Sequence, residues 1–238
     1  MTATMLTLYR GIIVPLNAKD AVSRAISTQG ITGGEGFWNF TKVAPSASPR
    51  TLLTKPDLTL QDTRVDQKTA VVCCCGDYEG AAFYATRSIK MGEVGLVIEV
   101  QSSKSEVYID GRDFLYTAFQ LWDRTTNTAF SRQAEWLKRI FGGAVVEYFE
   151  RTAHTTDQQT RIALCDLACH DADVIEAHRS NRYVLGGRYN TVFRSAFFVT
   201  APIAPKQIRP ITIVPSGWTA PTPDIDLRDF LEGRLPQG

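Results

Sequence analysis

The stretch Leu6-Thr7-Leu8-Tyr9-Arg10-Gly11-Ile12-Ile13-Val14 decides how this chain is interpreted. Its apolar and β-branched residues predict a strand near the N-terminus. Arg10 is the charged residue within that strand. A planar guanidinium on a rigid strand can pair with two phosphate oxygens at once, although an edge position or a salt bridge would explain Arg10 without a ligand.

Strand and helix patterns follow this stretch along the chain. Helical spacing of apolar residues from Ala18 to Ile26 ends at Gly30, and a loop region rich in Gly, Ser and Pro then extends from Ile31 to about Asp66. Further strands are predicted at Thr69–Cys75, Ala81–Thr86, Leu96–Val100, Tyr189–Thr200 and Ile208–Val214. Helical stripes are predicted around Phe114–Leu121, Phe130–Ile140 and Ile162–Ala168. We therefore expect an α+β fold with one domain over residues 1–214 and a loosely held C-terminal tail over residues 215–238.

The composition argues against several classes of protein. The 26 basic and 25 acidic side chains nearly cancel, so no global field attracts the chain to nucleic acid or to an anionic membrane. Its apolar runs are too short to cross a bilayer, and no secretory signal is present, so a cytoplasmic location without a membrane partner is expected. Cys165, Cys169 and His170 have helical spacing but no second ligand pair, so no metal site is expected.

Three segments in a fixed order carry a resemblance to a known family. They are Leu8-Tyr9-Arg10-Gly11, Phe83-Tyr84-Ala85-Thr86, and Phe197-Phe198-Val199 leading into Pro202-Ile203-Ala204-Pro205. Together they resemble the Arg-Ser-Glu class of mono-ADP-ribosyltransferases, which includes pertussis-toxin-like and pierisin-like enzymes. The resemblance implies an ADP-ribosyltransferase-like split β-sheet core with flanking helices, and NAD as the co-substrate.

The resemblance also implies roles for particular residues. Arg10, followed by Gly11, would lie against the NAD phosphates, and Thr86 with Tyr84 would support the nicotinamide pocket on a middle strand. Cleavage of the bond between nicotinamide and ribose develops positive charge on the sugar, which a nearby carboxylate stabilises. The family supplies that carboxylate as a Glu at the position that Ala196 occupies here.

Ala196 is the main departure from the family pattern. Either the chain is a naturally inactive relative, or the alanine is a deliberate substitution that silences a toxic enzyme, and the second explanation is favoured. A third reading takes Gln133-Ala134-Glu135 as the family's paired acidic motif and makes Glu135 catalytic. The helical periodicity around Glu135 opposes this reading, because the motif belongs on a loop that enters a strand.

Several aromatic residues are candidates for contact with NAD. Tyr108 and Tyr116 flank a predicted strand, turn and helix start, and either could pack near the nicotinamide or form a structural corner. Phe37 and Trp38 lie in the Gly-rich loop region. They could stack on a nicotinamide, an adenine or a target base, or could equally anchor the loop.

The leading functional hypothesis is an intracellular toxin or effector that transfers ADP-ribose from NAD to a macromolecule. Phe37 and Trp38, together with Arg188, Arg194 and Arg209, slightly favour a nucleic-acid base over a protein side chain as acceptor. An antitoxin protein is the partner expected of such a toxin.

Two other classes of function stay open at this stage. Without its Glu, the same fold could be a non-catalytic module that binds NAD or ADP-ribose. A hydrolase that uses His154, His170 or His178 is weakly supported, because no Gly-x-Ser-x-Gly elbow accompanies a strand.

Overall fold

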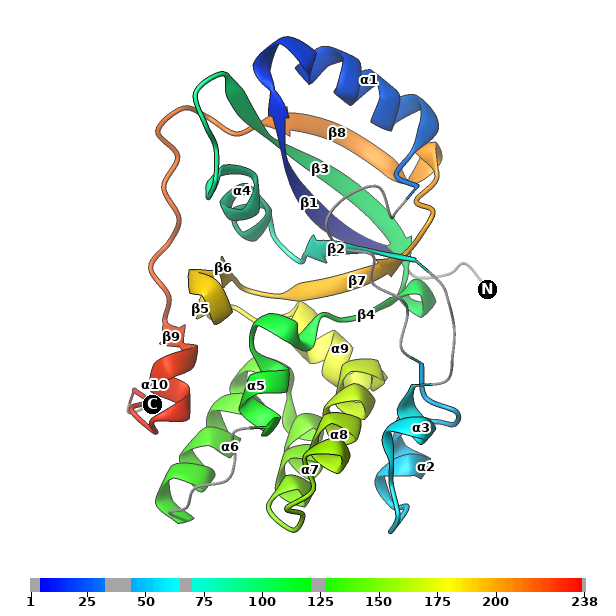
Figure 1. Cartoon of the computed structure of the whole chain (residues 1–238), viewed down its shortest axis with the longest axis vertical. Coiled ribbons are helices and arrows are strands. Elements are labelled where there is room, and N and C mark those ends of the chain that lie inside the picture. The colour runs from blue at the N-terminus through cyan, green and yellow to red at the C-terminus, as the bar shows by residue number, and fades with distance from the viewer. Residues whose placement is uncertain (1–4, 33–43, 65–69, 121–126, 237–238) are drawn as a thin grey trace. The chain divides into compact units, whose positions relative to one another are not determined.

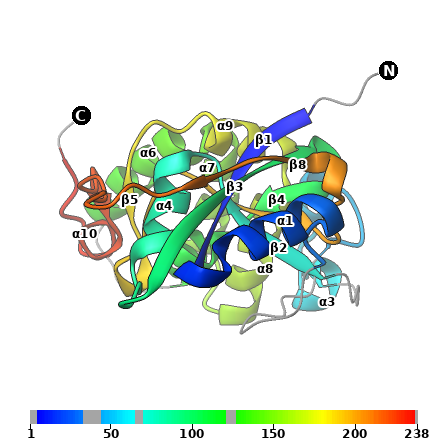
Figure 2. The same ribbon diagram turned by 90° about the horizontal axis from the view of Figure 1, so that it is seen from above.

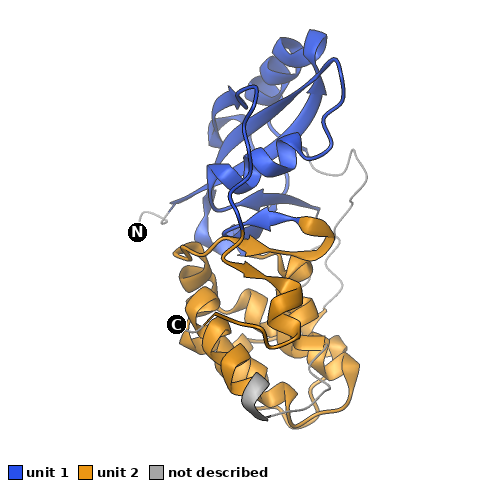
Figure 3. Cartoon of the chain, turned by 90° about the vertical axis from the view of Figure 1, so that its left-hand side faces the viewer, with its two compact units in different colours: residues 1–42, 68–108, 191–222 blue, residues 43–67, 109–190, 223–238 orange. Residues whose placement is uncertain are grey.

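A computed structural model describes residues 5–32, 44–64, 70–120 and 127–236 of the chain. The chain forms two compact units (Figure 3). Unit 1 comprises Met1–Lys42, Lys68–Tyr108 and Thr191–Thr222, and unit 2 comprises Val43–Gln67, Ile109–Asn190 and Pro223–Gly238. The single domain over residues 1–214 stays a prediction.

Unit 1 is built on a six-stranded sheet with the strand order β4-β7-β2-β1-β3-β8 (Figure 1). The sheet's strands are β1 (Met5–Pro15), β2 (Val71–Cys75), β3 (Glu93–Ser103), β4 (Val107–Ile109), β7 (Ala196–Thr200) and β8 (Ile208–Ile213). The other elements of this unit are η1 (Leu16–Ala18), α1 (Lys19–Gln29), α4 (Tyr78–Thr86), η2 (Lys104–Glu106), β6 (Val192–Phe193) and η5 (Pro205–Gln207). The predicted α+β fold class is confirmed, as are the predicted strands within β1, β2, β3 and β8.

The sheet consists of two halves that meet at a single paired position. β1 pairs with β3 in antiparallel register from Met5↔Ser103 to Pro15↔Glu93, and β8 continues this half beyond β3 (Figure 1 and Figure 2). β2 pairs with β7, also antiparallel, along all of its five residues. β1 and β2, by contrast, pair only at Tyr9↔Cys75. The two halves therefore share one point of register, directly before Arg10.

Helix α4 corrects the prediction of a strand at Ala81–Thr86. Asp77 caps this helix, since its carboxylate accepts a hydrogen bond of 2.8 Å from the Gly80 backbone N–H. Small residues let the helix approach β1 and β3 closely: a Cβ added to Gly11 would lie 1.9 Å from the Ala81 carbonyl oxygen. The strand prediction was wrong because it followed the aromatic residues of this segment, which favour β structure. The Asp77 cap and the small residues favour a helix instead.

Unit 2 is mainly helical. Its elements are α2 (Pro49–Leu53), α3 (Leu60–Thr63), η3 (Gly111–Asp113), α5 (Leu115–Gln120), α6 (Asn127–Phe141), α7 (Gly143–Thr152), α8 (Gln158–His170), α9 (Ala172–Arg179), β5 (Leu185–Gly186), η4 (Arg188–Asn190), β9 (Ile225–Asp226) and α10 (Leu227–Leu231). Phe230 of α10 is fully buried, and Gln133 donates a hydrogen bond of 2.9 Å to its carbonyl. The short amphipathic turn that the sequence predicts around Phe230 and Leu231, at the end of the tail, corresponds to α10, which packs into unit 2.

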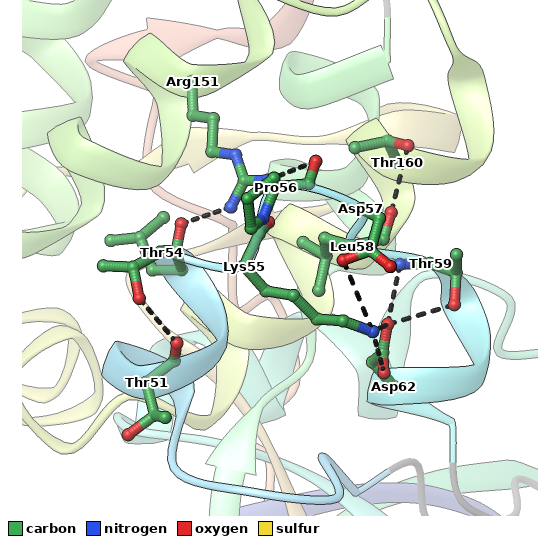
Figure 4. A network of polar contacts seen from close by, with 11 residues as sticks. Thr51, Thr54, Lys55, Pro56, Asp57, Leu58, Thr59, Asp62, Arg151 and Thr160 are labelled. Carbon is green, nitrogen blue, oxygen red and sulfur yellow. Dashed lines mark hydrogen bonds and ion pairs between the residues drawn. The ribbon is translucent and has the colours of Figure 1, made fainter.

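A polar network fixes the segment of α2 and α3 on the longer helices of unit 2 (Figure 4). Arg151 of α7 donates to the backbone carbonyls of Leu53 and Lys55. Lys55 Nζ contacts both carboxylate oxygens of Asp62 at 2.9 Å, and Thr160 of α8 donates to the Leu58 carbonyl at 3.3 Å. Within the described ranges, no helix has the length and apolar character that crossing a membrane requires.

Candidate functional site

Arg10 lies on β1 where the two halves of the sheet meet. Its half-buried side chain donates a hydrogen bond of 2.9 Å from Nη1 to the backbone carbonyl of Cys73 on β2. Among the residues that the structure describes, no carboxylate forms an ion pair with Arg10. A guanidinium carries five N–H donors in a planar group. This single hydrogen bond therefore leaves most of the donors of Arg10 for an anion.

The thiol of Cys74 on β2 is an ionisable group that the charge of Arg10 influences. Burial raises the pKa of the Cys74 thiol to about 12, while the positive charge of Arg10 acts in the opposite direction. The thiol is therefore neutral at physiological pH and does not neutralise the guanidinium. β2, which pairs with β1 at Tyr9↔Cys75, carries three consecutive cysteines.

Tyr9, Cys75 and Ala196 form a row across β1, β2 and β7 at the same junction. Neighbouring strands are about 4.8 Å apart, so the Ala196 Cα lies about 10 Å from the Tyr9 Cα. Strand alternation places these three side chains on one face and Arg10 on the other. The structure thus brings Arg10 and Ala196 to one junction, with side chains that leave the sheet on opposite faces. Ala196 is buried, with 6% of its surface exposed.

A group of charged side chains lies one step along the strands from that row. Asp77 follows β2 and Arg194 precedes β7, and the Arg194 guanidinium lies 3.8 Å from Asp77 Oδ1 and also pairs with Glu79. The other oxygen, Asp77 Oδ2, is buried and has no hydrogen-bond partner within the described residues. Burial raises the pKa of Asp77 above its usual range, and hydrogen bonding by the Gly80 and Arg194 backbones together with the charge of Arg194 opposes that shift. The Asp77 carboxylate is therefore incompletely satisfied.

Contacts with α4 or within it explain the next three predicted residues of unit 1. Gly11 faces α4, where its missing Cβ permits the close helix contact. Tyr84 packs half-buried against the small core around α4, and the Thr86 hydroxyl donates to the Ala82 carbonyl at 2.8 Å within the same helix. The prediction of Thr86 on a middle strand is therefore wrong, because the residue ends helix α4 and its hydroxyl is satisfied within that helix.

Tyr108 lies on β4, at the edge of the sheet that is three strands away from β1. This corresponds to about 14 Å at ordinary strand spacing. Its ring packs on Phe198 with centroids 5.2 Å apart, and its side chain is buried. These contacts favour the structural reading of Tyr108.

The other predicted residues lie in unit 2 or outside the described residues. Tyr116 and Glu135 belong to unit 2, where Tyr116 donates to Asp166 and Glu135 forms an i,i+4 ion pair of 3.2 Å with Arg139 on the surface of α6. Glu135 therefore lies within a helix, as its periodicity indicates. Phe37 and Trp38 lie outside the described residues.

Asp77 is the residue that the sequence analysis missed. A signal for it exists, because Asp77 is followed three residues later by Gly80 at the start of a run of small residues, which is typical of a capped helix. Recognising α4 would have placed Asp77 between the end of β2 and the start of that helix.

Comparison of the chain with models of known protein families, with curated proteins and with solved structures finds no match. The assignment of function therefore depends on the geometry of the site.

Proposed function

We propose that this chain binds NAD and transfers its ADP-ribose group to a macromolecular acceptor, in the manner of the mono-ADP-ribosyltransferases that its motifs resemble. The single observation that carries this proposal is Arg10, a half-buried arginine at the junction of a divided sheet, with no carboxylate partner among the described residues. A half-buried guanidinium without a counter-charge favours the binding of an anion. A diphosphate supplies phosphate oxygens at the spacing of the guanidinium N–H donors.

Two further features support NAD in particular. The division of the sheet at Tyr9↔Cys75 agrees with the split core that the resemblance implies. The rigidity of β1, which pairs along its full length with β3, would hold the guanidinium in one orientation while a flexible diphosphate binds.

As the acceptor, the sequence slightly favours a nucleic-acid base over a protein side chain. We propose that the chain acts as an intracellular toxin with an antitoxin protein as its partner. Arg194 no longer supports this preference, because it pairs with Glu79 and Asp77. Arg209 is exposed on β8 and Arg188 lies beside the exposed Tyr189 ring, at 5.2 Å from its centroid. Among the arginines cited for a nucleic-acid acceptor, these two still support it.

Ala196 favours a second candidate, a non-catalytic module that binds NAD or ADP-ribose. Its buried methyl group cannot stabilise charge on the ribose. The candidates are separated by offering labelled NAD, with RNA, DNA and protein acceptors, to the chain as given and to Ala196→Glu, and by identifying the products by mass spectrometry. Transfer by either chain, abolished by Arg10→Ala, supports the transferase. Binding of NAD without transfer by either chain supports the module, and no binding by either contradicts both.

A further inference from the structure

Three large apolar side chains are exposed together in unit 1, where β1 ends and β3 begins. Residues 87–92 join α4 to β3 (Figure 1), and all six are exposed. Met91 is fully exposed, and Ile89 exposes 42% of its surface. Leu16, which exposes 53%, follows β1 and donates its backbone N–H to the Gly92 carbonyl at 2.8 Å. We call Leu16, Ile89 and Met91 the apolar tip.

The backbone around Met91 is fixed by hydrogen bonds. The Glu93 N–H donates to the Lys90 carbonyl at 3.1 Å and closes a turn with Met91 and Gly92 at its centre. Gly92 has a φ of 85°, in the left-handed region that a type II turn requires at its third residue. The Glu93 carboxylate accepts a further hydrogen bond of 2.8 Å from the Lys90 N–H. The turn therefore holds Met91 in the solvent in a defined position.

The fold does not require an apolar residue at position 91. Because the Met91 side chain is fully exposed, a polar residue would replace it without loss of packing. Turns usually have Gly, Pro, Asn, Asp or Ser at their centres. Single exposed apolar residues are common on proteins, whereas grouped ones mark contact surfaces. A group of three beside a fixed turn therefore favours a role in binding.

The charges next to the apolar tip are mainly positive. The exposed segment between α4 and β3 contains Arg87 and Lys90 but no carboxylate. Around it, half-buried Lys19 adds a positive charge, and exposed Asp20 and half-buried Glu93 add negative ones. The Glu93 carboxylate already accepts the Lys90 N–H. The cations that alternate with the apolar side chains are therefore the most accessible charges of this surface.

Apolar side chains that alternate with cations match the surface of an anionic membrane. In such a contact the apolar groups enter the boundary between headgroups and acyl chains, while Lys and Arg remain against the lipid phosphates. A protein partner fits less well, because a specific interface buries about 800 Å² on each side and three partly exposed side chains supply much less.

We propose that the apolar tip is a membrane-binding site that recognises anionic lipid. Leu16, Ile89 and Met91 insert into the interface, and Arg87 and Lys90 bind headgroup phosphates. The expectation of no membrane partner considered the charge of the whole chain and the length of its apolar runs, whereas a surface contact depends on a local group of residues. This inference is independent of NAD binding.

The test is co-sedimentation of the full chain with vesicles of phosphatidylcholine alone and with vesicles of equal parts phosphatidylcholine and phosphatidylserine. Met91→Gln should lower the partition coefficient on the anionic vesicles at least about fivefold, because it removes the most exposed apolar group. Met5→Gln is the matched control, since Met5 is an exposed methionine at the opposite end of β1, and it should stay within about twofold of the parent.

A second pair of variants tests the charge. Lys90→Gln should lower partition on the anionic vesicles at least about threefold, whereas Lys206→Gln, at an exposed lysine of the same unit, should have no comparable effect. Thermal unfolding should give all four variants the Tm of the parent, because their side chains are exposed.

Three results would overturn the proposal. The first is no binding of the parent to anionic vesicles, and the second is equal partition of the parent and Met91→Gln. The third is equal partition of the parent on neutral and anionic vesicles, which would remove the role of the cations. Self-association of the parent that Met91→Gln abolishes, without vesicle binding, would assign the tip to a second copy of the chain instead.

Discussion

The two units treat their buried charges differently. In unit 2, the fully buried Asp166 accepts hydrogen bonds from Thr63, Arg64 and Tyr116, with the Arg64 Nε at 2.8 Å. In unit 1, Arg10 bonds only to a backbone carbonyl among the described residues, and Asp77 keeps one buried oxygen without a partner. In unit 2, the protein itself supplies the hydrogen-bond partners of the buried carboxylate. In unit 1, the hydrogen bonding of Arg10 and Asp77 is incomplete.

This difference separates structural charge from functional charge. A buried carboxylate with all its acceptor positions filled has no capacity left for a ligand, and removing it leaves its partners unsatisfied. An incompletely paired charge destabilises the empty protein slightly and gains its partner when a ligand binds. Unit 2 is therefore expected to respond to mutation mainly in stability, and the Arg10 junction of unit 1 mainly in function.

The largest expected effect comes from making the same substitution in both units. Asp166→Asn should lower the free energy of unfolding by about 2–3 kcal/mol, because it removes the charged acceptor that Thr63, Arg64 and Tyr116 share. Asp77→Asn should change it by less than about 1 kcal/mol, because asparagine keeps the cap. Urea denaturation measures both, and equal losses for the two variants would abolish the distinction between the units.

Glycine contacts sharpen the comparison, because unit 1 holds α4 by close backbone approach instead of a polar network. Gly11→Ala should destabilise by about 1–3 kcal/mol, since its Cβ would meet the Ala81 carbonyl oxygen at 1.9 Å. Gly143→Ala is the control: nothing lies within 4 Å of a Cβ there, and the helix α7 gains about 0.5–1 kcal/mol. Thermal unfolding of the two variants should show opposite shifts of Tm, and shifts of the same sign would contradict the packing of α4 on β1.

His178 tests whether the interior of unit 2 excludes charge. Burial lowers its pKa to about 3, against a hydrogen bond with the Ile140 backbone, and its ring stacks on Phe141 with centroids 4.3 Å apart. Between the unfolded pKa near 6.5 and the folded value, the unfolded chain takes up a proton that the folded chain does not. Stability from this residue is therefore present above pH 6.5 and falls by about 1.4 kcal/mol per pH unit below it.

The variant for this prediction is His178→Gln, which keeps an N–H donor but does not titrate. Its unfolding free energy, measured from pH 7 to pH 4.5, should fall less steeply than that of the parent. Parallel curves for the two proteins would mean that His178 becomes protonated without cost.

The smallest expected effect is at Glu135. Its ion pair with Arg139 is exposed, and such i,i+4 pairs contribute about 0.3–0.5 kcal/mol. Glu135→Ala should therefore lower stability by no more than that amount and leave nicotinamide release unchanged. A large loss of turnover would restore Glu135 as the catalytic acid and would move the site to unit 2.

Periodicity predicted most of the secondary structure from sequence, because β1 and α6 have clear apolar patterns. The exception is α4, whose small residues carry almost no periodic signal and whose aromatic residues suggest a strand. The short β6 and β7 replace one predicted long strand: positive φ at Tyr189 and Asn190 delays its start, and the strand is interrupted between Phe193 and Ala196. Such interruptions are set by tertiary contacts that local sequence does not encode.

The site was predictable only in part, for a similar reason. Arg10 could be singled out from its own strand, since a charge among apolar residues is visible in the sequence. Asp77 leaves a helix-cap signal in the sequence, but its position beside Arg194 depends on the pairing of β2 with β7, and 120 residues lie between Cys75 and Ala196. Strand pairing over such distances follows from the whole fold and not from neighbouring residues.

The most direct test of the incomplete junction is an equilibrium titration of NAD into the parent chain, Arg10→Ala and Arg24→Ala. Arg24 is an exposed arginine of α1 in the same unit and controls for the loss of one positive charge. The account predicts saturable binding that Arg10→Ala weakens at least tenfold, or about 1.4 kcal/mol, and that Arg24→Ala leaves within twofold. Equal affinity of all three proteins for NAD, or no binding by the parent, would contradict the claim that Arg10 binds an anionic ligand.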